Sequence, residues 1–160
     1  MTLAPNPPLN GNEVHEHILR MFPEGFSPHG VQYFLNMPAA TWTPQDHQSA
    51  LIDYFLEQCR KGHFPGKPSR YQSVFACESL EEAQQFRAKK RKVTDPIFEL
   101  KPQGSVHRGD MLVYSMAPTL AGVDRRLHLY WQGKTFDHPD HKPEWEHVLA
   151  LPVLVGERVE

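Results

Sequence analysis

Glu144 and Glu146 form a pair of acidic residues separated only by Trp145. They open an apolar stretch that predicts a strand, so both carboxylates are expected on the same face of it. A carboxylate can stabilise the positive charge that develops on a sugar when a glycosidic bond breaks, or it can hold a ribose hydroxyl. The alternative is a polar strand start in solvent, since strands disfavour glutamate.

Arg70 and Ser73 form a second candidate pair, directly after a loop rich in proline and glycine. Arginine offers a fork of donors, and serine offers both a donor and an acceptor, so the pair suits contact with an anion or a ribose. The alternative is a surface arginine beside a serine of the strand. Both interpretations stay open.

Histidines gather near the end of the chain, at His128, His138, His141 and His147. A metal site needs three or four converging ligands, and no HExxH motif accompanies these residues. We therefore expect solvated histidines and no metal, with a metal-dependent hydrolase as a further alternative. The basic run 89–92 resembles a nuclear-import signal, but a helix C-terminus also favours cations, and we prefer that interpretation.

Composition limits the class of protein. A chain of 160 residues with 39% hydrophobic and 22% charged side chains predicts one globular domain, at 13–160, after a flexible tail at 1–12. The net charge of −2 argues against general nucleic-acid binding, and no apolar run is long enough to span a membrane. With two cysteines and no visible leader, a cytoplasmic protein is expected.

Helical periodicity predicts helices at 13–22 and 43–61, and a capping box at Ser79–Glu82 predicts a third helix to about residue 90. Thr43 is the expected N-cap of the second helix, and Gly62 is expected just after its end. Period-two alternation predicts strands at 30–36, 70–77, 96–101, 127–132, 145–151 and 153–158, the last two as a pair bent at Pro152, with 111–116 ambiguous. Helices cluster early and strands late, which indicates the α+β class.

The order of several motifs resembles a family of bacterial domains of unknown function related to the RES-domain toxins and the ADP-ribosyltransferase fold. The most specific motif is PSRYQSVFA, which is followed by SLEEAQQF, PIFEL, HRGDM, LYWQG and PEWEHVLAL. The resemblance spans about residues 29–158. It implies an ADP-ribosyltransferase-like α+β fold, with two small β-sheets packed steeply around a cleft that binds NAD.

The resemblance also implies roles for individual residues. Glu146 would hold the nicotinamide ribose and promote cleavage, with Glu144 as its catalytic companion. Ser73 would shape the nicotinamide pocket, and Arg70 would contact phosphate or ribose. Asp110, in the HRGDM motif, is expected to stabilise a turn.

One further NAD-binding position, on the first core strand, falls on His29 or on Tyr33. The family pattern of an arginine or histidine inside that strand is met only in part, because His29 precedes the predicted strand.

The implied function is an enzyme that uses NAD as a substrate. It would transfer ADP-ribose to a macromolecular acceptor such as a protein, or it would hydrolyse NAD. It would act in the cell that produces it, or as a toxin-like effector delivered to another cell. The alternative is a catalytically silent binding module with the same fold.

Overall fold

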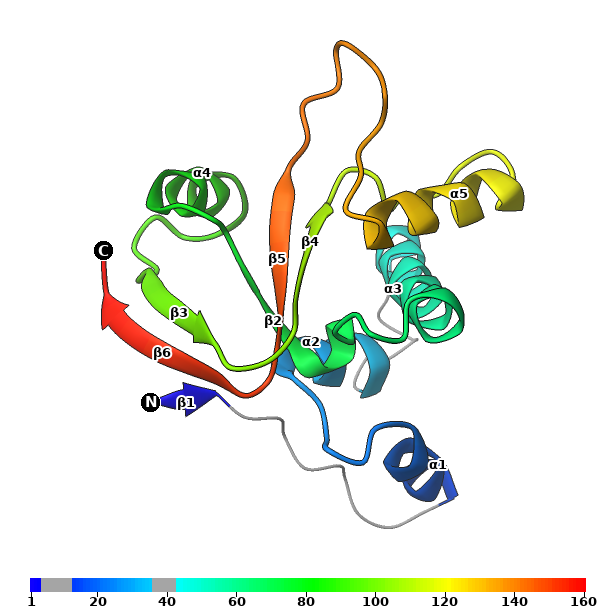
Figure 1. Ribbon diagram of the computed structural model, residues 1–160, viewed down its shortest axis with the longest axis horizontal. Helices are drawn as coiled ribbons and strands as arrows, with labels where there is room; N and C mark the ends of the chain where they lie inside the picture. The colour runs from blue at the N-terminus through cyan, green and yellow to red at the C-terminus, as the bar shows by residue number, and fades with distance from the viewer. Residues whose placement is uncertain (4–12, 36–42) are drawn as a thin grey trace.

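The computed structural model describes residues 1–3, 13–35 and 43–160. Within these ranges the strands form two three-stranded antiparallel sheets, one with the order β1-β6-β3 and the other with the order β2-β5-β4 (Figure 1). The α+β class predicted from the sequence is therefore confirmed. The strands are β1 Thr2–Leu3, β2 Ser73–Ala76, β3 Phe98–Pro102, β4 Val106–Asp110, β5 Trp145–Ala150 and β6 Val153–Arg158.

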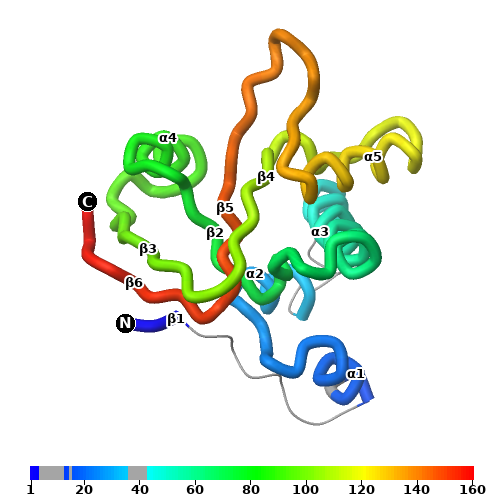
Figure 2. The backbone as a smooth tube through the Cα atoms, in the orientation of Figure 1, coloured from blue at the N-terminus to red at the C-terminus, as the bar shows by residue number. Residues whose placement is uncertain are grey.

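The helices surround the β2-β5-β4 sheet. Figure 1 shows α3 and α5 on one side of this sheet, with α4 and the other sheet on the opposite side. Figure 2 shows the start of the chain lying beside β6, with which β1 pairs. None of the helices described is long and apolar enough to cross a membrane. The helices are α1 Glu13–Met21, α2 Pro28–Gly30, α3 Pro44–His63, α4 Leu80–Lys90 and α5 Leu120–Trp131, with a π-helical turn at Val31–Leu35 and a 3₁₀ turn at Arg70–Gln72.

Helix α3 begins where the sequence predicts. Thr43 accepts a hydrogen bond from the backbone N–H of Asp46 at 3.2 Å, and the Asp46 carboxylate accepts one from the N–H of Thr43 at 2.9 Å. This reciprocal capping box satisfies two donors that a helix start otherwise leaves unpaired. The predicted end is wrong, because Gly62 lies inside the helix and Phe64 is the C-cap.

The strand predicted at 30–36 is wrong over its described part. Pro28 begins a short helix, and the Ser27 hydroxyl accepts a hydrogen bond from the backbone N–H of Gly30 at 3.2 Å. The chain then continues as the π-helical turn, so local capping overrides the apolar alternation. Asn36 lies outside the described residues.

The strand predicted at 127–132 is also wrong, because this segment completes α5. Thr119 caps the helix by accepting a hydrogen bond from the N–H of Gly122 at 3.1 Å. Leu127 and Trp131, four positions apart, both face the core, which is helical spacing. The apolar run was too short for its period to distinguish a strand from a helix.

Other predicted strands are correct in part. The segment 70–77 begins with the 3₁₀ turn before β2, and the ambiguous segment 111–116 forms turns. The two last strands, β5 and β6, do not pair with each other. The chain leaves one sheet and enters the other at Leu151–Pro152.

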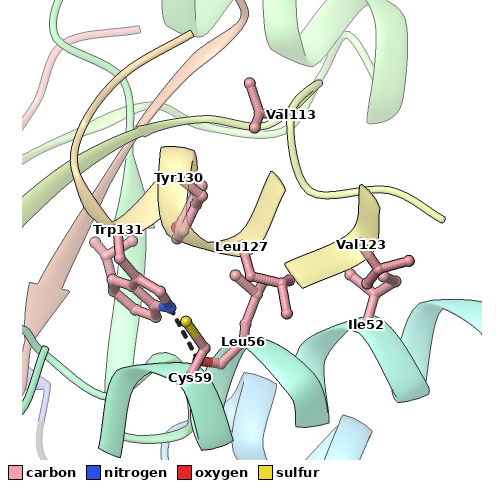
Figure 3. Close-up of a cluster of buried hydrophobic side chains, with 9 residues drawn as sticks. Ile52, Leu56, Cys59, Val113, Val123, Leu127, Tyr130 and Trp131 are labelled. Carbon is pink, nitrogen blue, oxygen red and sulfur yellow. Dashed lines mark hydrogen bonds between the residues drawn. The ribbon is translucent and has the colours of Figure 1, made fainter. Parts of the chain in front are cut away.

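Helices α3 and α5 build the main core. The Leu56, Leu127 and Trp131 side chains are no more than 5% exposed, and the Trp131 indole donates a hydrogen bond to the Leu56 carbonyl at 2.9 Å (Figure 3). Each fully buried side chain of this size contributes about 1.5–3 kcal/mol. This packing fixes the position of α3 against α5, and both helices supply side chains to the site described below.

Gly109 of β4 packs tightly against the ring of Tyr130. A Cβ atom at Gly109 would lie 2.3 Å from the Tyr130 ring, whereas nothing lies within 4 Å of a Cβ at Gly62. We expect Gly109→Ala to lower the free energy of unfolding by about 1–3 kcal/mol, because the ring must move. Gly62→Ala, inside a helix, should raise it by about 0.5–1 kcal/mol. Urea unfolding measures both, and a Gly109→Ala protein as stable as wild type would contradict the packing.

Candidate functional site

A buried arginine, Arg70, is the centre of a hydrogen-bonded cluster on the α3 side of the β2-β5-β4 sheet. Its side chain is 4% exposed. Nε donates to Asp53 Oδ1 at 2.8 Å, and Nη1 donates both to the Tyr130 hydroxyl at 2.6 Å and to Glu146 Oε1. Nη2 lies 3.4 Å from the Tyr114 hydroxyl. The guanidinium is thus paired with two carboxylates.

Aromatic rings enclose the same guanidinium. Its central carbon lies 4.6 Å from the Phe75 ring centroid, 4.8 Å from that of Tyr114 and 5.5 Å from that of Tyr130. Arginine is suited to this environment because its planar, weakly hydrated cation stacks on ring faces. The rings also exclude water and so strengthen the ion pairs.

The charges in this cluster support one another. Burial disfavours the charged guanidinium, but Glu146, Tyr130 and Asp53 outweigh it and hold the pKa of Arg70 well above its ordinary value. Burial also disfavours the Asp53 carboxylate, yet Arg70 and His29 lower its pKa to about 2. Burial raises the pKa of Tyr130, which therefore stays a hydrogen-bond donor.

His29 joins the cluster through Asp53. Its Nε2 lies 2.6 Å from Asp53 Oδ2, and its ring lies 4.6 Å from that of Tyr33. The His29 side chain is 18% exposed, so the cluster reaches solvent at this end. Asp53 therefore connects a partly exposed imidazole to a buried guanidinium.

A cleft of about 350 Å³ opens over this end of the cluster. That volume lies within the range of about 300–1,000 Å³ typical of small-molecule sites. Its walls include His29, Tyr33, Asp53, Arg70 and Tyr114. Aromatic faces, a carboxylate and a buried cation therefore surround one opening.

The structure brings together four of the six residues that the sequence singled out: His29, Tyr33, Arg70 and Glu146. Ser73 lies in the same region, but it is buried and donates its hydroxyl proton to the Ser69 carbonyl at 2.6 Å. In this position its hydroxyl supports the turn before β2.

Glu144 lies apart from this cluster. Strand β5 begins after it, and its carboxylate pairs with Lys89 of α4 at 3.0 Å, whereas Glu146 faces Arg70. The expectation that both carboxylates share one face is therefore wrong. Both side chains of the Lys89 pair are substantially exposed, so the bridge is weak.

Three residues of the cluster were not singled out from the sequence. Of these three, only Asp53 is marked in the sequence as a candidate, because it is an acidic residue between apolar residues of a predicted helix. Tyr130 fell in the segment mistaken for a strand, and Tyr114 in the ambiguous segment. Neither tyrosine gave a signal of its own.

Asp110 fixes the start of β5. Its buried carboxylate accepts hydrogen bonds from the backbone N–H groups of Leu112 and Glu144 at 3.0 Å, and lies 2.6 Å from the Thr135 hydroxyl and from His141 Nε2. Burial would raise its pKa, but these hydrogen bonds lower it. The turn-stabilising role expected for Asp110 fits this geometry, and Glu144 lies two residues before Glu146.

The clustered histidines do not converge. His141 contacts Asp110, His138 is exposed beside Asp140, and His128 lies beside Cys59. In the part of the chain that is described, no group of three or more His, Cys, Asp or Glu side chains is placed to hold a metal ion.

A second, larger cavity lies on the opposite face of the β2-β5-β4 sheet. It has a volume of about 920 Å³ and is bounded by α4, β3 and this sheet. Its lining includes Val106, His147 and Leu149, and it also includes Phe75 and Glu146, which contact Arg70. The protein thus offers two cavities separated by one sheet.

Acid unfolding should report on Asp53. Its folded pKa of about 2 is below the ordinary 3.8, so it contributes stability that is fully present above about pH 4 and is lost as the pH falls through about 2. The contribution is roughly 2 kcal/mol. We expect Asp53→Asn to be destabilised at about pH 6 and to differ less from wild type at about pH 2. Urea unfolding across this range measures the difference, with exposed Asp124→Asn as control. A difference between Asp53→Asn and wild type that did not change with pH would contradict the expectation.

The fold and the cluster define an α+β domain with two small sheets and a buried, charged centre beneath a cleft. The chain belongs to the family described as protein of unknown function (DUF2441), whose family model matches residues 26–159. The match contains every residue of the Arg70 cluster and all strands except β1. No curated protein matches the chain.

Proposed function

We propose that this protein is an ADP-ribosyltransferase-like enzyme that cleaves the bond between nicotinamide and ribose in NAD. The observation that carries the proposal is the Glu146 carboxylate, held by Arg70 and Tyr130, because the same Arg70 lines the cleft together with His29 and Tyr33. The two small sheets, and the motif order that resembles the ADP-ribosyltransferase fold, support it.

The reaction needs one well-placed carboxylate. When the bond between ribose C1′ and the pyridinium nitrogen breaks, its electron pair leaves with nicotinamide and positive charge develops on the ribose. Glu146 would stabilise that charge, as carboxylates do in glycoside hydrolysis. An oxygen or nitrogen nucleophile then bonds to C1′ and releases its proton. The nucleophile is water, which gives NAD hydrolysis, or a group of a protein acceptor.

The neighbours of Glu146 orient it. Arg70 and the Tyr130 hydroxyl both donate to Oε1, the hydroxyl at 2.7 Å. In this proposal Oε2 would face the ribose. Because the guanidinium and the phenol are themselves fixed by other contacts, the carboxylate is preorganised before substrate arrives.

The open end of the cluster would bind the nicotinamide. His29 and Tyr33 present aromatic surface to the cleft, and Asp53 fixes the imidazole. In this proposal Arg70 positions Glu146, because its Nε and Nη1 donors are engaged by Asp53, Tyr130 and Glu146. Ser73 acts indirectly, by supporting the turn that carries Arg70.

A second candidate function is a catalytically silent binding module. It is favoured by the same hydrogen bonds, because Glu146 Oε1 is already occupied and the carboxylate is 7% exposed. Such a module would bind its partner or NAD without releasing nicotinamide.

Stabilisation by NAD tests the proposal. A ligand present at about 100 times its dissociation constant stabilises a protein by roughly 2.7 kcal/mol, so the unfolding midpoint should rise with NAD concentration. A non-hydrolysable NAD analogue should give the same shift, which separates binding from turnover. If neither shifts the midpoint at millimolar concentration, the proposal is wrong. If both shift it without nicotinamide release, the silent module is the better account.

A further inference from the structure

The Arg70 cluster carries more negative than positive charge. The guanidinium is paired with Asp53 on one side and with Glu146 on the other, so one cation faces two carboxylates. Counting these three groups alone, the sum is one net negative charge. All three charged groups are at most 7% exposed, so solvent screens this excess poorly.

Among the described residues that line the cleft, no further full charge offsets this excess. Apart from His29, the only charged side chains among the described lining residues are Asp53 and Arg70. The remaining walls are neutral amides and hydroxyls, apolar groups and the rings of Tyr33 and Tyr114. Segments 4–12 and 36–42, outside the described residues, contain no Asp, Glu, Lys or Arg.

Arg70 is poorly placed to receive an anion despite its charge. Its Nε and Nη1 donors are engaged by Asp53, Tyr130 and Glu146, which leaves Nη2, whose contact with the Tyr114 hydroxyl is 3.4 Å long. An anion that reached Nη2 would lie beside the two carboxylates that pair with the same guanidinium, and they would repel it. A cation that enters the cleft instead meets the excess carboxylate charge and the ring faces, both of which attract it.

We propose that the cleft selects its ligand by charge, and binds a planar organic cation in preference to a neutral ring of the same shape. This inference rests on the proposed function in placing the nicotinamide end of NAD in the cleft. It adds that the positive charge of the pyridinium itself strengthens binding in the cleft. Once the glycosidic bond breaks, the nicotinamide that leaves is neutral and binds less tightly.

The test compares 1-methylnicotinamide, a cation, with nicotinamide, which is neutral and nearly the same shape. We expect calorimetry on the full chain at low ionic strength to give about tenfold tighter binding of the cation. Asp53→Asn, which removes the excess charge, should bring the two affinities to within about twofold. Asp124→Asn removes one exposed negative charge from α5, outside the cleft lining, and should keep the preference.

The outcomes separate this inference from the proposed function. Equal binding of both rings, tighter binding of nicotinamide, or no binding of either would overturn the inference, and the wild-type comparison alone decides this if Asp53→Asn fails to fold. Nicotinamide release from NAD without a preference for the cation would leave the function intact and the inference wrong. A preference for the cation without nicotinamide release would leave the inference intact and the proposed function wrong.

Discussion

The Glu146→Gln protein should release nicotinamide from NAD about 100–1,000-fold more slowly than wild type, because a neutral amide cannot stabilise the ribosyl cation as a carboxylate does. The amide oxygen can still accept hydrogen bonds from Arg70 and Tyr130 in place of Oε1. The loss should therefore appear in kcat more than in KM. Quantifying free nicotinamide by chromatography over a range of NAD concentrations measures both.

Glu144→Gln is the matched control, since it makes the same chemical change two residues earlier. Its side chain contacts Lys89 on α4 and not the Arg70 cluster. We expect its rate to stay within about twofold of wild type, because an exposed ion pair contributes at most about 1 kcal/mol and this one lies away from the reaction. If Glu144→Gln loses activity as fully as Glu146→Gln, the assignment of the catalytic carboxylate is wrong.

Replacing Arg70 should have the largest effect on folding. Arg70→Met keeps much of the apolar stem but leaves Asp53 and Glu146 buried without their cation. Removing one partner of a buried ion pair costs about 3–5 kcal/mol. We therefore expect a loss of that size in the free energy of unfolding, measured by urea denaturation, with the slope unchanged.

Arg108→Met provides the comparison. Arg108 lies 3.8 Å from Glu78 and 3.8 Å from the Trp145 ring, but its side chain is 45% exposed. Exposed pairs and exposed cation–π contacts each contribute about 1 kcal/mol or less, so this variant should be only slightly destabilised. Equal losses for Arg70→Met and Arg108→Met would show that the buried cluster does not hold the fold together.

Local signals predicted the helices that carry their own caps. Helix α3 begins after Thr43, and α4 begins after Ser79, which accepts a hydrogen bond from the Glu82 N–H at 3.2 Å. Such caps involve residues within one turn, so a single sequence reveals them. The Ser27 cap of α2 is equally local, and it explains why the chain is helical where a strand is predicted at 30–36.

Tertiary contacts decided what local patterns could not. The segment 127–132 packs against α3, and that contact, invisible in the sequence, makes it helical. Likewise, the alternation of Glu144 and Glu146 predicted a shared face, but the strand begins between them. Where a strand starts depends on its partners and on the Asp110 turn, which are distant in sequence.

The sequence pointed to individual residues of the site, but it did not show which of them contact one another. Arg70 and Glu146 were singled out separately, yet their contact across 76 positions of sequence could not be predicted from either motif. Asp53 joins them only because α3 packs beside the sheet. The charge balance of the cluster, on which the binding preference depends, appears only when all three are placed together.

We propose that NAD binds on the Arg70 side of the β2-β5-β4 sheet, with its ribose at Glu146. A crystal structure of the protein with a non-hydrolysable NAD analogue tests this most directly, because the two cavities lie on opposite faces of that sheet. We expect the nicotinamide ring to lie between His29, Tyr33 and Tyr114, with ribose C1′ facing the Glu146 carboxylate. An analogue bound only in the larger cavity, or a cleft left empty at saturating concentration, would contradict it.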